Sequence, residues 1–196
     1  MISREEALKF VREKMSKENI VKHMIAVEQC MGGLHDYLSQ KGITDLGGTK
    51  EEWMMAGLLH DADYLEGEIP HEKMGIQVTD WLRERGFEIP ENVAHAMAAH
   101  NWHATNTEPI TLMDWAIFCA DSLTGLIVAC ALVMPSKSLS DVNLERIIKK
   151  FGNKAFAAGT RRDEVAMCEE KIGISLNDFF TVCLKVMQDH HEEIGL

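Results

Sequence analysis

Six histidine and aspartate residues stand at positions where helical periodicity predicts a buried face, and together they have the chemistry of a metal site. The clearest pair is His60 and Asp61, which directly follow the apolar run MMAGLL at 54–59. One histidine on an apolar face is usually a hydrogen-bonded core residue, but burying six such groups separately would cost several kcal/mol. One or two divalent cations would satisfy them all, because neutral imidazole and ionised carboxylate are natural ligands. The six are His23, His60, Asp61, His71, His100 and Asp121.

Helices must position these groups, because apolar residues recur at helical spacing along nearly the whole chain. We find no alternating strand pattern, internal repeat or low-complexity linker. The sequence of 196 residues therefore predicts an all-α fold in one domain, 1–196, with about seven to nine helices. The metal-site core would occupy about 20–135, and a C-terminal helical extension about 136–196. Helices are expected at 19–39, 50–62, 71–82, 93–100, 112–134, 140–151, 161–172 and 176–193.

Two of these helices have particular features. In the helix at 71–82, the residues His71, Gly75, Val78 and Leu82 fall at i, i+4, i+7 and i+11, on one predicted face. The helix at 112–134 begins at a Thr111–Asp114 cap and is long and apolar enough to raise the question of a membrane span. Because Asp114 and Asp121 would be costly in lipid, we expect an interior helix instead.

Composition narrows the class of protein. The net charge of −11 argues against binding to a nucleic-acid polymer or to an anionic membrane, although a local basic patch would still suit a phosphorylated substrate. Five cysteines without a CxxC pair predict buried free thiols rather than a disulfide framework or a structural zinc site. The charged N-terminal residues MISREEALKF lack an apolar signal core, so the sequence predicts a cytoplasmic protein.

The order of the candidate ligands resembles the HD superfamily of metal-dependent phosphohydrolases. The resemblance is carried by His23, the HD pair at 60–61 and Asp121 in FCADSLTG. HEKMG at 71–75 and AAHNWH at 98–103 resemble segments of the two-metal branch, which implies that His71 and His100 hold a second metal or contact substrate. Stretches such as GLLHDADY, KKFGNKAFAAGTRRDEV and CEEKIGISLNDFF resemble a group of predicted HD hydrolases of unassigned substrate.

The resemblance implies a fold and a reaction. The fold would be an HD-domain helical bundle. The reaction would be hydrolysis of a phosphate ester in a nucleotide-like or other small phosphorylated molecule, through a metal-bound hydroxide. Donors of nitrogen and oxygen without thiolate favour Fe, Mn, Co, Ni or Zn, and Mg is also compatible. Homo-oligomerisation is left open.

Asp61 and Asp63 are the candidate catalytic carboxylates. Asp61 is placed to bridge metals or to orient water. Asp63 stands where glycine is frequent in the family, and three roles remain open for it: binding metal, holding a metal-bound water, or capping a helix end. We favour a role outside the first ligand shell or in capping.

Phosphate would be met by a small set of polar groups. The basic concentration around FGNKAFAAGTRR makes Lys154 and Arg161 the preferred candidates, although these charges equally suit a solvated helix face. Asn101 and His103, beside His100, are further candidates for contact with substrate.

Two other functions remain open. Some HD-fold proteins use a di-iron site to oxidise substrates with dioxygen, and a histidine-rich second site is compatible with that chemistry. A metal-retaining nucleotide-binding or regulatory module without turnover is the non-enzymatic alternative.

Overall fold

The structure, a computed structural model, describes residues 2–65 and 68–196, and all regular secondary structure in them is helical. The predicted all-α class is therefore confirmed. The described residues contain eleven α-helices, of which eight have eight residues or more and the other three are about one turn long. The α-helices are α1 (Arg4–Lys14), α2 (Glu18–Gln40), α3 (Lys50–Leu59), α4 (Gln77–Glu84), α5 (Glu91–Ala99), α6 (Trp102–Thr105), α7 (Leu112–Leu132), α8 (Leu144–Phe151), α9 (Arg162–Ala166), α10 (Leu176–Asp189) and α11 (His191–Ile194).

Two 3₁₀ turns and one π turn complete the helical structure: η1 (His71–Lys73), η2 (Leu139–Asp141) and η3 (Cys168–Ile172). The predicted helix at 161–172 is divided at Met167 into α9 and the π turn. The predicted helix at 176–193 is likewise divided at His190 into α10 and α11.

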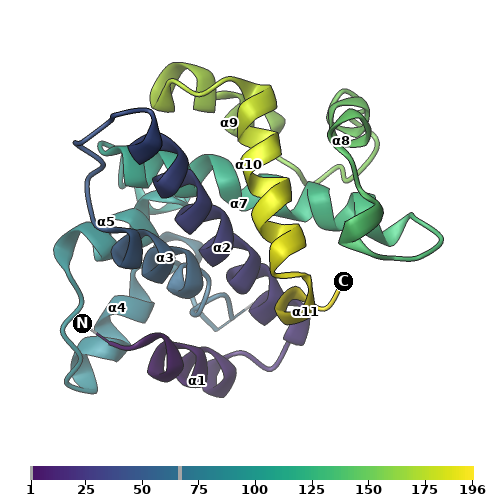
Figure 1. Cartoon of the computed structure of the whole chain (residues 1–196). Helices are drawn as coiled ribbons and strands as arrows, with labels where there is room; N and C mark the ends of the chain where they lie inside the picture. The colour runs from purple at the N-terminus through teal and green to yellow at the C-terminus, as the bar shows by residue number, and fades with distance from the viewer. Residues whose placement is uncertain (1, 66–67) are drawn as a thin grey trace.

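The long helices α2 and α7 form the centre of the molecule. Figure 1 shows α3 and α10 lying beside α2, with α10 also crossing in front of α7, while α1 and α4 lie toward the lower edge of that view. The approach of α3 to α2 depends on Gly57, where a Cβ atom would meet the backbone of Glu28 at 2.8 Å. This packing positions the turn after α3 relative to α2, and that turn carries His60 and Asp61.

Helix α7 is an interior helix. Its Thr111 side chain accepts a hydrogen bond from Asp114 N, and Asp114 bonds back to Thr111 N, which confirms the predicted cap. By length and composition α7 could cross a membrane, but 67% of its most apolar window is buried inside the protein. Asp121 therefore lies on a helix that is mostly buried in the core.

The predicted continuous helix through His71 and Leu82 is wrong. The chain makes the short turn η1, extends at Met74, and begins α4 only at Gln77. Gly75 between them has φ +88°, and a Cβ atom there would meet Met97 O and the ring of His100. The helical spacing of the apolar residues was real, but the backbone breaks because this loop must pass close to α5.

Candidate metal centre

The four residues that carry the family resemblance lie together in space. His23 comes from α2, His60 and Asp61 follow the end of α3, and Asp121 comes from the middle of α7. His23 Nε2 lies 3.0 Å from Asp121 Oδ1 and 3.7 Å from Asp61 Oδ2. His60 Nε2 lies 3.5 Å from Asp61 Oδ2 and 3.9 Å from Asp121 Oδ1. Two imidazoles and two carboxylates thus face one small space.

His100, at the end of α5, is the fifth member of this cluster. Its Nε2 lies 3.4 Å from Asp61 Oδ1, and its ring packs edge to face against His60 with centroids 4.8 Å apart. Asp61 therefore has an imidazole nitrogen from three different helical segments within 4 Å. Of the two histidines assigned to a second metal, His100 is in contact with the cluster.

Hydrogen bonds on the outer side of the rings orient all three imidazoles. Nδ1 of His60 lies 2.8 Å from Gly57 O, and Nδ1 of His100 contacts Met97 O. Because a carbonyl oxygen only accepts, each Nδ1 must carry a proton, and in the neutral ring Nε2 then presents a lone pair to the cluster.

His23 reaches the same tautomer through Thr124. The Thr124 hydroxyl donates to Asp121 O at 2.8 Å, so its oxygen is free to accept from His23 Nδ1 at 3.1 Å. Thr124 therefore connects the orientation of His23 to the backbone that carries Asp121. The sequence analysis missed it, although its position one turn after Asp121 on the same helix face was a usable signal.

The electrostatics differ between the donors of the cluster. The carboxylates and His60 are held in the forms that cations bind, whereas the pKa of His100, like that of His23, is raised: burial acts to lower it, but the hydrogen bond to Asp61 outweighs burial and favours the protonated ring. Burial lowers the pKa of His60 to about 4, so this imidazole is neutral at pH 7. Burial alone would raise the pKa of Asp61 and Asp121, but nearby imidazoles, His60 for Asp61 and His23 for Asp121, hold both below their ordinary values. Burial would likewise lower the pKa of His23, but its hydrogen bond to Asp121 raises it overall.

One buried atom of the cluster has no hydrogen-bond partner among the described residues. His60 is fully buried, and its Nε2 has no hydrogen-bond partner. A buried imidazole lone pair without a partner is costly unless a donor or a metal meets it. Donor atoms of His23, His60 and Asp61 all lie within 4.8 Å of one another. The residues present therefore fit a transition-metal ion with mixed nitrogen and oxygen ligands.

Asp63 has the capping role that the sequence analysis favoured, and among the described residues no hydrogen bond links its carboxylate to the cluster. Its carboxylate is fully buried and accepts from Gly75 N at 2.9 Å and from Val78 N at 3.0 Å. Burial raises its pKa to about 6, while these backbone donors act in the opposite direction. Asp63 is a capping residue, and the helix it caps is α4 rather than its own.

His71 is not in contact with the cluster. It is exposed on η1, and in the part of the chain that the structure describes its ring lies within 4.0 Å of no carboxylate of the cluster. It does line a cavity of about 250 Å³ together with Asp61, His100 and Asn101. The Asn101 side chain donates to His71 O at 3.1 Å, so it holds the turn in place beside that cavity.

Arg161 is the cation at the cluster. Its Nη2 lies 2.6 Å from Asp121 Oδ2, and its Nε donates to Ser122 Oγ at 3.1 Å. The side chain is 42% exposed and stands between the 250 Å³ cavity and a second cavity of about 420 Å³ that reaches His23. Lys154, by contrast, is exposed and lines neither cavity.

Glu164 is a second residue that the sequence analysis missed. This buried carboxylate lies 2.7 Å from Arg161 Nε and 3.3 Å from His103 Nε2. His103 is otherwise exposed, so its link to the site runs through Glu164. The i, i+3 spacing from Arg161 was the only signal in the sequence.

Comparisons with protein-family models, with curated proteins and with solved structures find no match to this chain. The HD-superfamily resemblance thus stays a prediction from the motifs, and the function must be argued from the site itself.

Proposed function

We propose that this protein is a metal-dependent phosphohydrolase that cleaves a phosphate ester of a nucleotide-like or other small phosphorylated molecule. The observation that carries the proposal is the buried, unpartnered Nε2 of His60, which faces two ionised carboxylates and two further imidazoles. His23, His60, Asp61 and Asp121 would hold the first ion, and His100 is the candidate ligand of a second. When bound, such ions acidify water and withdraw charge from a phosphoryl oxygen.

The chain's own groups supply the rest of the site. Arg161 offers a planar, permanently charged donor fork at the cavity mouth, which is the geometry that phosphate oxygens bind best. Glu164 and Ser122 fix the direction of that fork. The backbone carbonyls of Gly57 and Met97 keep the lone pairs of His60 and His100 directed at the cluster.

The experiment begins with protein purified without chelators. Elemental analysis identifies the metal, and a phosphate-release screen over phosphomonoesters and phosphodiesters is then run with that metal. Each assay is done with and without oxygen. We expect phosphate release that is independent of oxygen and is lost when a chelator removes the metal. Oxygen uptake with iron and no phosphate release would contradict hydrolysis and favour the di-iron oxygenase.

A further inference from the structure

A groove leaves the candidate metal centre along α7, and the chemistry proposed above does not use it. Its first part is the cavity of about 420 Å³ that includes His23, Asp121 and Gly125. A further cavity of about 500 Å³ continues from the same His23 and Gly125 toward Leu132 and Leu196. Both cavities share these two lining residues, so they adjoin beside the candidate metal ligands, and the second extends toward the end of α7.

The groove follows a single face of α7. Asp121, Gly125, Val128 and Leu132 stand at i, i+4, i+7 and i+11, which places them in one row along the helix. Eleven residues of helix span about 16 Å, so the groove would hold an extended organic group of that length. The row begins with a candidate ligand and ends with apolar side chains.

Gly125 has no role that the protein itself explains. It lies inside a helix, where glycine is less stable than alanine, and its φ is not positive. A Cβ atom built there would meet no heavy atom within 4 Å, whereas one at Gly57 would meet the backbone of α2. Gly125 is exposed, and its missing side chain leaves the surface of α7 open where the two cavities share their lining residues.

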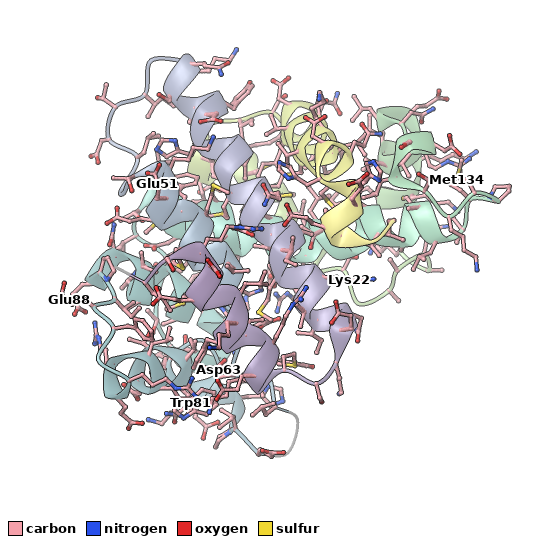
Figure 2. All side chains as sticks on the ribbon, turned by 60° about the horizontal axis from the view of Figure 1, so that its bottom comes forward. Lys22, Glu51, Asp63, Trp81, Glu88 and Met134 are labelled. Carbon is pink, nitrogen blue, oxygen red and sulfur yellow. The ribbon has the colours of Figure 1, made fainter. Side chains whose placement is uncertain are left out.

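The far part of the groove is apolar on one side. Val128 and Leu132 of α7 face Ile194 and Leu196 near the C-terminus, and Leu132 is 50% exposed. The opposite side carries Lys22, whose ammonium group lies against Gly195; Figure 2 shows it beside the C-terminal end of the chain. Apolar surface next to a phosphate-binding site favours phosphate esters whose organic group is apolar.

We infer that this groove binds the hydrocarbon part of the substrate, so that the protein acts on phosphate esters of apolar alcohols. This inference rests on the proposed function. The phosphoryl group lies at the metal cluster beside Arg161, and the alkyl or aryl group extends over Gly125 toward Leu132. Burial of the alkyl or aryl group displaces water from the apolar side of the groove, so Kd falls as that group becomes longer.

The test uses alkylphosphonates, which carry a phosphoryl head but cannot be hydrolysed. Binding of methyl-, butyl- and octylphosphonate to the metal-containing protein is measured by calorimetry. We expect Kd to fall about twofold to fourfold for each added methylene, the range for partial to full burial. Equal Kd values for the three ligands, or no binding of any of them, would overturn the inference.

Two variants locate the effect. A Cβ atom at Gly125 meets no neighbour, so Gly125→Leu should place its side chain over the junction, and octylphosphonate should then bind no tighter than methylphosphonate. Gly152→Leu is the matched control, because Gly152 is exposed at the end of α8, outside both cavities. If the gain with chain length survives in Gly125→Leu, the groove is not the subsite.

A third variant, Leu132→Asn, keeps the inference testable if Gly125→Leu does not fold. Leu132→Asn changes a half-exposed side chain at the far end of the groove and should weaken octylphosphonate while leaving butylphosphonate unchanged. If the groove exists but the hydrolase proposal fails, phosphonate binding still depends on Gly125, and the phosphate-release screen finds no ester that is hydrolysed. Hydrolysis at equal kcat/KM for methyl and octyl phosphate would overturn the groove alone.

Discussion

Asp61 and Asp63 stand two residues apart, and their carboxylates have opposite surroundings. Three hydrogen bonds of 2.9–3.0 Å from backbone N–H groups satisfy Asp63. The neighbours of Asp61 are imidazole nitrogens at 3.4–3.7 Å, longer than ordinary hydrogen bonds. Burial raises the pKa of Asp63 to about 6, whereas for Asp61 imidazoles outweigh burial and lower the pKa. Backbone N–H groups satisfy the carboxylate of Asp63, whereas that of Asp61 faces imidazole nitrogens, where a cation would complete it.

This contrast separates two kinds of buried carboxylate that look alike in the sequence. Asp63 is fully buried, and Figure 2 labels it close to the N-terminal helix in that view. Asp61 lines the 250 Å³ cavity instead. Substitution of the first should therefore change stability, and substitution of the second should change metal binding.

The largest effect is expected from Asp61→Asn. The amide removes a negative charge from the cluster, so we expect metal content near zero and phosphate release reduced about 10³-fold or more. The thermal midpoint of the metal-free protein should change little, because no backbone group depends on this carboxylate. Asp189→Asn, at an exposed position that pairs with Lys185, is the control. If Asp61→Asn binds as much metal as the wild type, Asp61 is not a metal ligand.

Asp63→Ala should give the next largest effect, and it should fall on stability. The substitution leaves the buried N–H groups of Gly75 and Val78 without an acceptor, which costs about 2 to 4 kcal/mol of unfolding free energy. Urea denaturation of the metal-free protein measures it. An unfolding free energy equal to that of the wild type would show that the capping bonds contribute nothing.

Thr124→Val tests the orientation of His23. Valine keeps the shape of the side chain but removes the oxygen that accepts from His23 Nδ1. Loss of such an outer hydrogen bond usually weakens metal binding about 10- to 100-fold. Thr124→Ser restores the hydroxyl and should recover most of the affinity. If valine and serine variants bind metal equally, the tautomer of His23 is set by something else.

Arg161→Gln should have the smallest effect of the four. Metal content should stay at the wild-type level, while KM for a phosphate ester rises about tenfold through loss of a charged hydrogen bond. Arg161→Lys keeps the charge without the planar fork and should be intermediate. Steady-state kinetics with measured metal content distinguishes them, and a loss of metal in Arg161→Gln would instead make Arg161 a support for Asp121.

The helical fold was predictable because its signals are local. Caps such as Thr111 with Asp114 and the apolar rows of α2 and α7 depend on neighbours within one or two turns. The same rows placed His23 and Asp121 on inward faces, and the turn after α3 placed His60 beside them. Helical periodicity predicted the inward position of each residue, and the family resemblance predicted that they meet at one site.

What failed depends on contacts between distant segments. The break at Gly75 arises from its approach to Met97, and the function of Asp63 depends on the N–H groups that this break exposes. The role of Glu164 depends on Arg161 and His103 meeting across the site mouth. No local pattern records such pairings, so a helix was predicted across Gly75, and the sequence left three roles open for Asp63, of which the structure bears out capping.

The most direct measurement is anomalous X-ray diffraction from crystals of protein purified without chelators, collected at the absorption edge of the metal found by elemental analysis. We predict an anomalous peak within coordination distance, about 2.0–2.3 Å, of His60 Nε2 and of a carboxylate oxygen of Asp61. A map with no peak there, from crystals in which His60 Nε2 is met by an ordered hydrogen-bond donor of the protein, would contradict the metal centre.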